Sequence, residues 1–169
     1  MMTMIILSVL LAVLYVGAAI WALRGLPVSI SSMVYVLPEG AARWLWSLWL
    51  IAVDVLTFAP LMDVLDGRGL AVVAFIPMAL LAFVAAMPIF MEENKKAHDI
   101  MGVAAGVMSQ VCVALICADW LFAWALFVFL AGSVYVQPSG WLGKAINKKT
   151  VFVVEAVCYI SIIGCQVIN

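Results

Sequence analysis

The chain has 169 residues, of which 69% are hydrophobic and only 10% are charged, and its formal net charge is -1. A soluble globular domain usually carries about 25% charged residues, so this composition, with a mean hydropathy of +1.27, excludes a water-soluble fold. Nucleic-acid binding is not expected either, because proteins with that function present a basic face that neutralises phosphates.

Hydropathy along the chain predicts six apolar helices that cross a membrane. A helix needs about 20 residues to cross a hydrocarbon core of about 30 Å. Runs of about this length lie near residues 4–22, 43–64, 70–90, 98–117, 119–136 and 150–167. They are too long and too evenly apolar for the alternating strands of a barrel. The expected fold is therefore all-α, a polytopic transmembrane helical bundle that forms one domain over residues 1–169.

The first span precedes the longest predicted connection, residues 24–42. We interpret residues 4–22 as a span and not as a signal peptide, because no Lys or Arg precedes them and the apolar run exceeds a usual signal core. The middle of the loop, residues 26–38, is too apolar to lie in water, and its two prolines exclude a continuous helix. Two interpretations stay open: an interfacial amphipathic segment, or a re-entrant loop whose three serines line a site.

The second span contains Asp54, the only charged residue within residues 45–62. A carboxylate at the bilayer centre costs roughly 2.5–3.5 kcal/mol by insertion scales, so it normally faces a partner, a water-filled cavity or a transported ion. Helical spacing places Ser47 and Thr57 on the face of Asp54, and Asp54 about 16 Å along the helix from Arg43, near the midplane. The sequence thus makes Asp54 and Thr57 candidates for binding or translocation.

The fourth span begins beside His98, the only histidine of the chain. We interpret His98 as an interfacial residue bonded to headgroups or to a neighbouring loop. Gly102 and Gly106 form a G-x-x-x-G pair, which predicts a face where another helix packs closely because no side chains intervene. Gln110 lies further along the same helix as a candidate lining residue.

The sixth span is the most polar of the six and contains Glu155 and Tyr159. Glu155 is expected one to two turns inside the cytoplasmic boundary, where it either extends its carboxylate to water or points into the bundle. If it points inward, Asp54, His98 and Glu155 converge on a cavity that faces the cytoplasm. Gln110 and Tyr159 would line the same cavity.

The loop charges predict an orientation in the cell membrane. With six spans both termini lie on one side, and seven of the eight Lys and Arg residues fall in the loops on the opposite side: Arg24, Arg43, Lys95, Lys96, Lys144, Lys148 and Lys149. Only Arg68 falls on the side of the termini. The positive-inside rule therefore places both termini on the non-cytoplasmic side.

The four cysteines all fall inside predicted spans and form no C-x-x-C pair of the kind that binds zinc or exchanges disulfides. We interpret them as apolar packing residues. Cys117 and Cys165 are expected near the same face of the membrane, which leaves a disulfide between them open. No cofactor is predicted, and the sequence does not decide whether a metal is bound.

Three functions stay open at the level of the sequence. The first is a small translocator in which Asp54 binds a proton, a small cation or a small solute, with His98 and Glu155 at its inner entrance. The second is a structural or accessory subunit that packs against a second copy or a partner membrane protein, with lipid as its surroundings. The third is an intramembrane metal-dependent lipid hydrolase, although a catalytic zinc normally takes three protein ligands and favours His.

Overall fold

A computed structural model describes residues 1–117 and 149–169, together with Val128. These residues form five numbered α-helices and three short 3-10 helices, and they contain no strand. The expected all-α class is therefore confirmed for the described part of the chain. The predicted span 119–136 lies outside the described residues, so the count of six spans stays a prediction.

Four of the described helices are long and apolar enough to cross a membrane. They correspond to the predicted spans 4–22, 43–64, 98–117 and 150–167, and their bounds are α1 Met2–Leu23, α2 Trp44–Asp66, α4 Lys95–Ile116 and α7 Thr150–Ile168. Each contains about 19 to 23 residues. At about 1.5 Å per residue, these lengths match the thickness of a hydrocarbon core.

The helix in the third predicted span is shorter than the apolar run from which the span was predicted. The run covers residues 70–90, but α3 extends only over Ala71–Ala86. Pro88 explains the early end, because the residue before a proline, here Met87, is sterically disfavoured in the helical conformation. The 16 residues of α3 give about 24 Å of helix, less than a hydrocarbon core of about 30 Å.

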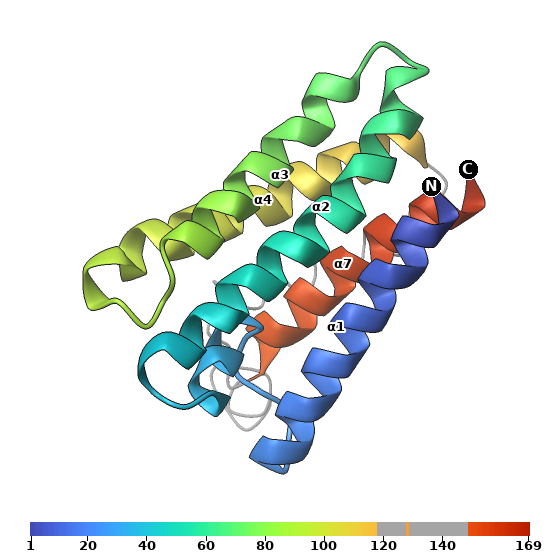
Figure 1. The fold of residues 1–169 in the computed structure, drawn as a ribbon. Coiled ribbons are helices and arrows are strands. Elements are labelled where there is room, and N and C mark those ends of the chain that lie inside the picture. Colours follow the sequence, from blue (N-terminus) through green and yellow to red (C-terminus); the bar gives the residue numbers. More distant parts are fainter. Residues whose placement is uncertain (118–127, 129–148) are drawn as a thin grey trace.

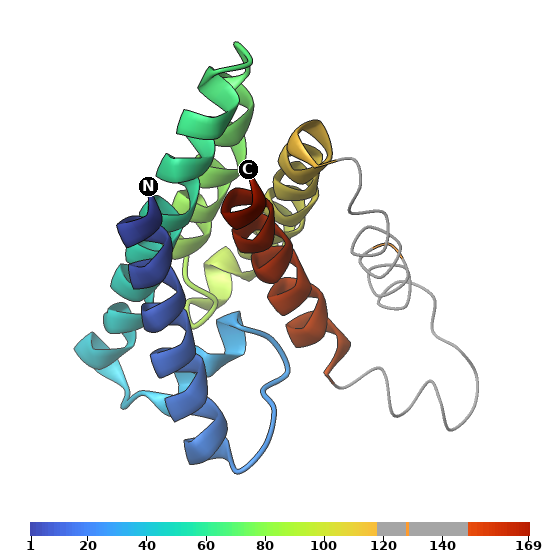
Figure 2. The ribbon, with the colours of Figure 1, turned by 90° about the vertical axis from the view of Figure 1, so that its right-hand side faces the viewer.

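The helices form one bundle around α2. Helix α2 packs against α1, α3 and α7, while α4 packs against α3 and α7. Figure 1 shows the N- and C-termini at one end of the bundle, which we call the termini end. The connection between α1 and α2, with its 3-10 helices η1 Ser31–Val36 and η2 Gly40–Arg43, lies at the opposite end, the loop end (Figures 1 and 2).

Two apolar clusters fill the bundle. One lies toward the termini end and joins α2, α3, α4 and α7; its buried members are Phe58, Leu61, Leu65, Ala74, Cys112, Val113, Ile116, Ile162 and Cys165. The other lies at the loop end and includes Val34 of η1 beside Trp46 and Leu50 of α2 and Val84 and Ala85 of α3. Part of the first loop is thus packed into the interior.

Arg68, the one basic residue predicted on the side of the termini, bonds the end of another helix. It follows α2 and donates hydrogen bonds from Nη1 to the carbonyl of Leu115 (2.7 Å) and from Nη2 to the carbonyl of Ile116 (3.5 Å). These carbonyls belong to the last turn of α4, where backbone acceptors lack helical partners and a cation is favoured. Arg68 therefore ties the α2–α3 connection to the C-terminal end of α4.

Replacing Arg68 with Met should lower the free energy of unfolding by about 1 kcal/mol, because the C-terminal carbonyls of α4 lose a cationic donor at an exposed site. The fall should appear as a lower melting temperature in detergent. Arg24→Met is the matched control, since Arg24 is also exposed at a helix end but its side chain has no hydrogen bond in the described structure. Equal melting temperatures of the two variants would contradict the role of Arg68.

Candidate functional site

Asp54 is buried inside the bundle and lacks a hydrogen-bond partner among the described residues. Its side chain is 3% exposed, and its Oδ1 atom accepts no hydrogen bond within the described part of the protein. Ser47 and Thr57, which helical spacing places on the same face, are buried as well. A buried polar atom without a partner costs about 1–3 kcal/mol, and an unpaired charge costs more. The Oδ1 atom of Asp54 therefore has a hydrogen-bonding capacity that no described residue uses.

Asp54 lies near the middle of its helix. It is 10 residues from the first residue of α2, Trp44, and 12 from the last, Asp66, which correspond to about 15 and 18 Å. Helices α2 and α4 run in the same direction, and the Trp46 ring lies 5.9 Å from the His98 ring. Eight residues further along each helix are Asp54 and Gly106. The acid is thus about 12 Å deeper in the bundle than His98.

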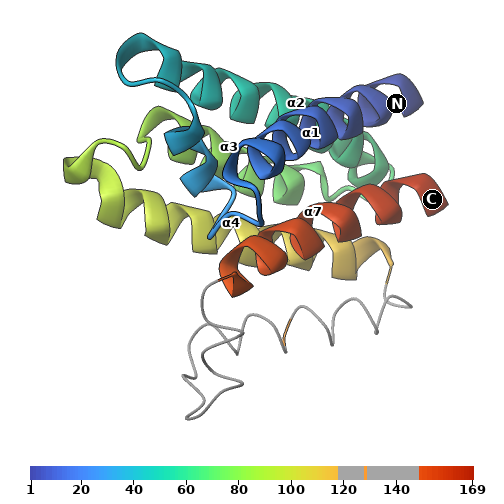
Figure 3. The ribbon, with the colours of Figure 1, turned by 90° about the horizontal axis from the view of Figure 1, so that it is seen from below.

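A chain of three hydroxyl groups lies one helical turn from Asp54. Thr57 Oγ1 of α2 is 2.7 Å from Ser8 Oγ of α1, and Ser8 Oγ is 2.8 Å from the Tyr159 hydroxyl of α7. Gln166 of α7 also donates from Nε2 to the backbone carbonyl of Thr57 (3.0 Å). Three helices therefore meet through polar side chains at this level, with α7 beside α1 in the view of Figure 3.

Gln110 belongs to a separate polar contact between α4 and α7. Its Oε1 accepts a hydrogen bond from Ser161 Oγ (2.9 Å), and its Nε2 donates to the Cys158 carbonyl (3.3 Å). Nearby, a Cβ added at Gly106 would lie 3.8 Å from Cys158 Sγ, whereas no described atom lies within 4 Å of one added at Gly102. Gly106 thus borders α7, and Gly102 does not border a described neighbour.

His98 and Glu155 meet the first loop at two consecutive residues. The Ile30 amide donates a hydrogen bond to Glu155 Oε2 (2.5 Å), and Ser31 Oγ lies 2.8 Å from His98 Nε2. The other ring nitrogen of His98 lies 2.9 Å from the Met87 carbonyl. These contacts agree with the interpretation of His98 as a residue bonded to a neighbouring loop. The carboxylate of Glu155 is bonded to the first loop, and its side chain is partly buried.

The loop held in this way closes the loop end of the bundle. Met33 and Val34 of η1 are 0% exposed, and Tyr15 of α1 donates a hydrogen bond to the Met33 carbonyl (3.3 Å). Ser29 and Ser32 bond each other reciprocally, since the amide of each donates to the hydroxyl of the other at 3.0 Å. We call residues 29–36 the plug. Whether the plug enters the membrane stays a prediction.

The candidate residues therefore divide into separate groups. Thr57 and Tyr159 share the hydroxyl chain, His98 and Glu155 share the plug, and Gln110 joins α4 to α7. Asp54 contacts none of these side chains through a described hydrogen bond, so the contacts do not gather Asp54, His98 and Glu155 at one point. Ser8 was missed because a single serine in an otherwise apolar span gives little signal; its partners come from helices whose neighbours the sequence does not reveal.

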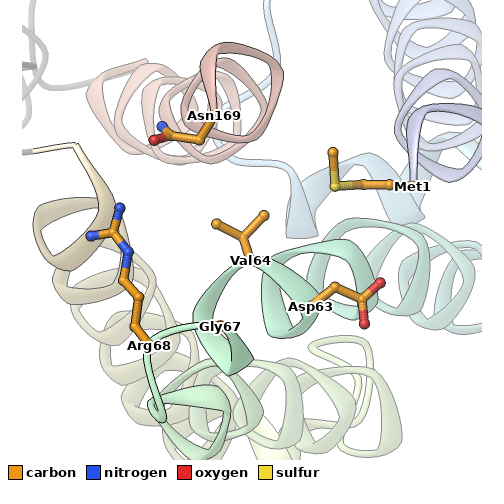
Figure 4. A pocket seen from close by; sticks show the side chains of 6 residues that line it. All are labelled: Met1, Asp63, Val64, Gly67, Arg68 and Asn169. Carbon is orange, nitrogen blue, oxygen red and sulfur yellow. The ribbon is translucent and has the colours of Figure 1, made fainter.

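An open hollow of about 380 Å³ lies at the termini end, away from the candidate residues (Figure 4). Its lining consists of Met1, Asp63, Val64, Gly67, Arg68 and Asn169. Arg68, its only basic lining residue, already donates to the end of α4. The hollow therefore does not enlarge the site around Asp54.

The described residues offer little to a metal ion. No group of three or more His, Cys, Asp or Glu residues among them is arranged to hold one. Both ring nitrogens of His98 already contact oxygen atoms of the chain.

Comparison with known proteins found no matching family model, no matching curated protein and no matching solved structure.

Replacing Ser8 with Ala should lower the free energy of unfolding by about 1 kcal/mol, because Thr57 and Tyr159 lose their shared hydroxyl partner inside the bundle. The measurement is a denaturation curve in mixed micelles. Thr3→Ala on the same helix is the control, since Thr3 is exposed. A loss no larger than that of the control would contradict a stabilising hydroxyl chain.

Replacing Glu155 with Ala should loosen the plug, because the Ile30 amide loses its acceptor. Backbone amides of the plug should then exchange hydrogen for deuterium about tenfold faster, as measured by mass spectrometry. Glu155→Gln should protect the plug better than Ala does, since its amide oxygen can still accept the hydrogen bond. Glu39→Ala, at an exposed loop residue, should leave exchange in the plug unchanged. Equal protection in all three variants would show that Glu155 does not hold the plug.

Proposed function

We propose that this multi-pass integral membrane protein moves a proton or a small cation across the membrane, with Asp54 as the group that binds it. The observation that carries the proposal is the buried Oδ1 atom of Asp54, which has no hydrogen-bond partner in the described structure. An intramembrane acid that pairs with no basic or amide group is typical of a site that exchanges protons or ions.

The packing around Asp54 favours a small transported species. Phe58 and Leu61, the next residues along the same side of α2, are 1% and 0% exposed, so the helix face is closely covered. A proton needs no added volume, and a small dehydrated cation needs little. The hydroxyl groups of Thr57, Ser8 and Tyr159 lie beside this level and can exchange protons or offer oxygen ligands. A larger solute would require the helices to separate.

The plug gives the proposed pathway a closed side. We assign the loop end to the cytoplasm, because five of the six basic residues in the described chain lie in its loops or helix starts there: Arg24, Arg43, Lys95, Lys96 and Lys149. Both termini then face away from the cytoplasm. In this orientation the plug, with Met33 and Val34 each 0% exposed, lies on the cytoplasmic side of Asp54. Transport would require the plug to move.

The competing proposal is a structural or accessory subunit that assembles with a second copy or another membrane protein. The observation in its favour is that several buried polar side chains already bond one another across helices, as Gln110 bonds Ser161 and Thr57 bonds Ser8. Such contacts hold helices together in lipid without transport. Asp54 is the residue that separates the two proposals, since a structural contact would give it a partner.

Asp54→Asn tests the proposal in liposomes, because the substitution preserves the shape of the side chain and removes its ability to bind a proton or a cation. Influx of protons should be followed with an internal pH-sensitive dye under a valinomycin-set potassium potential, and influx of Na⁺ with an ion-sensitive dye. We expect wild-type flux of one ion above that of empty liposomes, and a fall of at least tenfold in the variant.

Asp63→Asn is the matched control, because Asp63 lies on the same helix but is exposed near its end. It should retain wild-type flux. Unchanged flux in Asp54→Asn, or no flux of either ion in the wild type, would overturn translocation and leave the accessory role.

A further inference from the structure

The cysteines of the described chain fall into two regions. Cys158 lies in the middle of the bundle beside Gly106. The other three lie toward the termini end: Cys112 and Cys165 are members of the apolar cluster there, and Cys117 packs against it. Cys117 is only partly buried, while Cys112 and Cys165 are each 0% exposed. Of these three thiols, that of Cys117 lies at the edge of the bundle, and those of Cys112 and Cys165 lie in its interior.

One amide group connects Cys117 to Cys165. Asn169 Nδ2 lies 2.9 Å from Cys117 Sγ and donates to the Cys165 carbonyl at 3.0 Å. Cys117 also packs against the apolar cluster of which Cys165 is a buried member. Cys112 is directed elsewhere, since its thiol donates to the Val73 carbonyl of α3 (3.6 Å). Cys117 and Cys165 are thus the two cysteines that one amide group brings close together.

We propose that Cys117 and Cys165 are a disulfide-forming pair that joins the end of α4 to the last turn of α7. The two thiols release two protons and two electrons as the S–S bond forms. The electrons reduce one disulfide of a low-molecular-weight or protein oxidant to two thiols, so the reaction is an ordinary thiol–disulfide exchange. Cys117 reacts first, because it is the more exposed of the two, and forms a mixed disulfide with the oxidant while one thiol of the oxidant leaves. Cys165 then attacks the Cys117 sulfur of this mixed disulfide and releases the second thiol of the oxidant.

The location of the pair fits this chemistry. It lies at the termini end, which the distribution of basic residues assigns to the non-cytoplasmic side, and disulfides form and persist in oxidising compartments outside the cytosol. The link would also close a long stretch of chain, residues 117–165, and would restrict the unfolded state accordingly. The proposal depends on this orientation but not on ion transport.

The test is to oxidise the purified full-length protein with oxidised glutathione, alkylate the remaining thiols and map the peptides by mass spectrometry without reduction. We expect a peptide pair linked through Cys117 and Cys165, with Cys112 and Cys158 alkylated after denaturation. Oxidation should raise the melting temperature by several degrees, and dithiothreitol should reverse the rise. Cys158→Ser is the matched control and should retain both results.

Cys117→Ser and Cys165→Ser should each abolish the linked peptide and the rise in melting temperature. Cys117 is partly exposed, so its replacement should leave the fold intact and keep the comparison valid if Cys165→Ser is unstable. Recovery of both cysteines as free thiols after oxidation, or a link that uses Cys112 or Cys158 instead, would overturn the assignment. None of these outcomes depends on whether the protein transports an ion.

Discussion

Polar groups inside this bundle have to find partners within the chain, because neither lipid nor an apolar core supplies hydrogen bonds. The hydroxyl chain through Ser8 and the amide of Gln110 meet this requirement by joining helices that are distant in sequence. Among the described residues, Asp54 Oδ1 does not meet it, and neither do Arg43 Nε, Trp46 Nε1, Ser47 Oγ and Gln166 Oε1. Asp54 is the only acid in this set, and for that reason the proposed binding of a proton or a cation is assigned to it.

The two ends of the bundle satisfy the constraint in different ways. At the loop end, Glu155 and His98 fix the plug through its backbone and a serine, so that an apolar loop becomes part of the interior. At the termini end, Arg68 supplies donors to the final carbonyls of α4. At the loop end the contacts thus hold a loop segment, whereas at the termini end they hold the end of a helix.

These arrangements relate the proposals to one another. Ion movement through Asp54 would need water to reach the acid from both sides, and the plug stands on the cytoplasmic side in the orientation that the charges favour. A link between Cys117 and Cys165 would fasten α4 to α7 at the other side. Because α7 also bears Glu155 and Tyr159, the movement of this one helix would affect both the plug and the hydroxyl chain.

The sequence by itself determined the helical class, the approximate bounds of four spans and the common buried face of Ser47, Asp54 and Thr57, because hydrophobicity and helical periodicity are local properties. It did not determine which helices are neighbours. The contact of Ser8 with Tyr159 and that of Ile30 with Glu155 join residues more than 100 positions apart, so only the tertiary structure decided them. That no described residue bonds Asp54 Oδ1 is likewise a tertiary property, since it depends on the side chains packed around it.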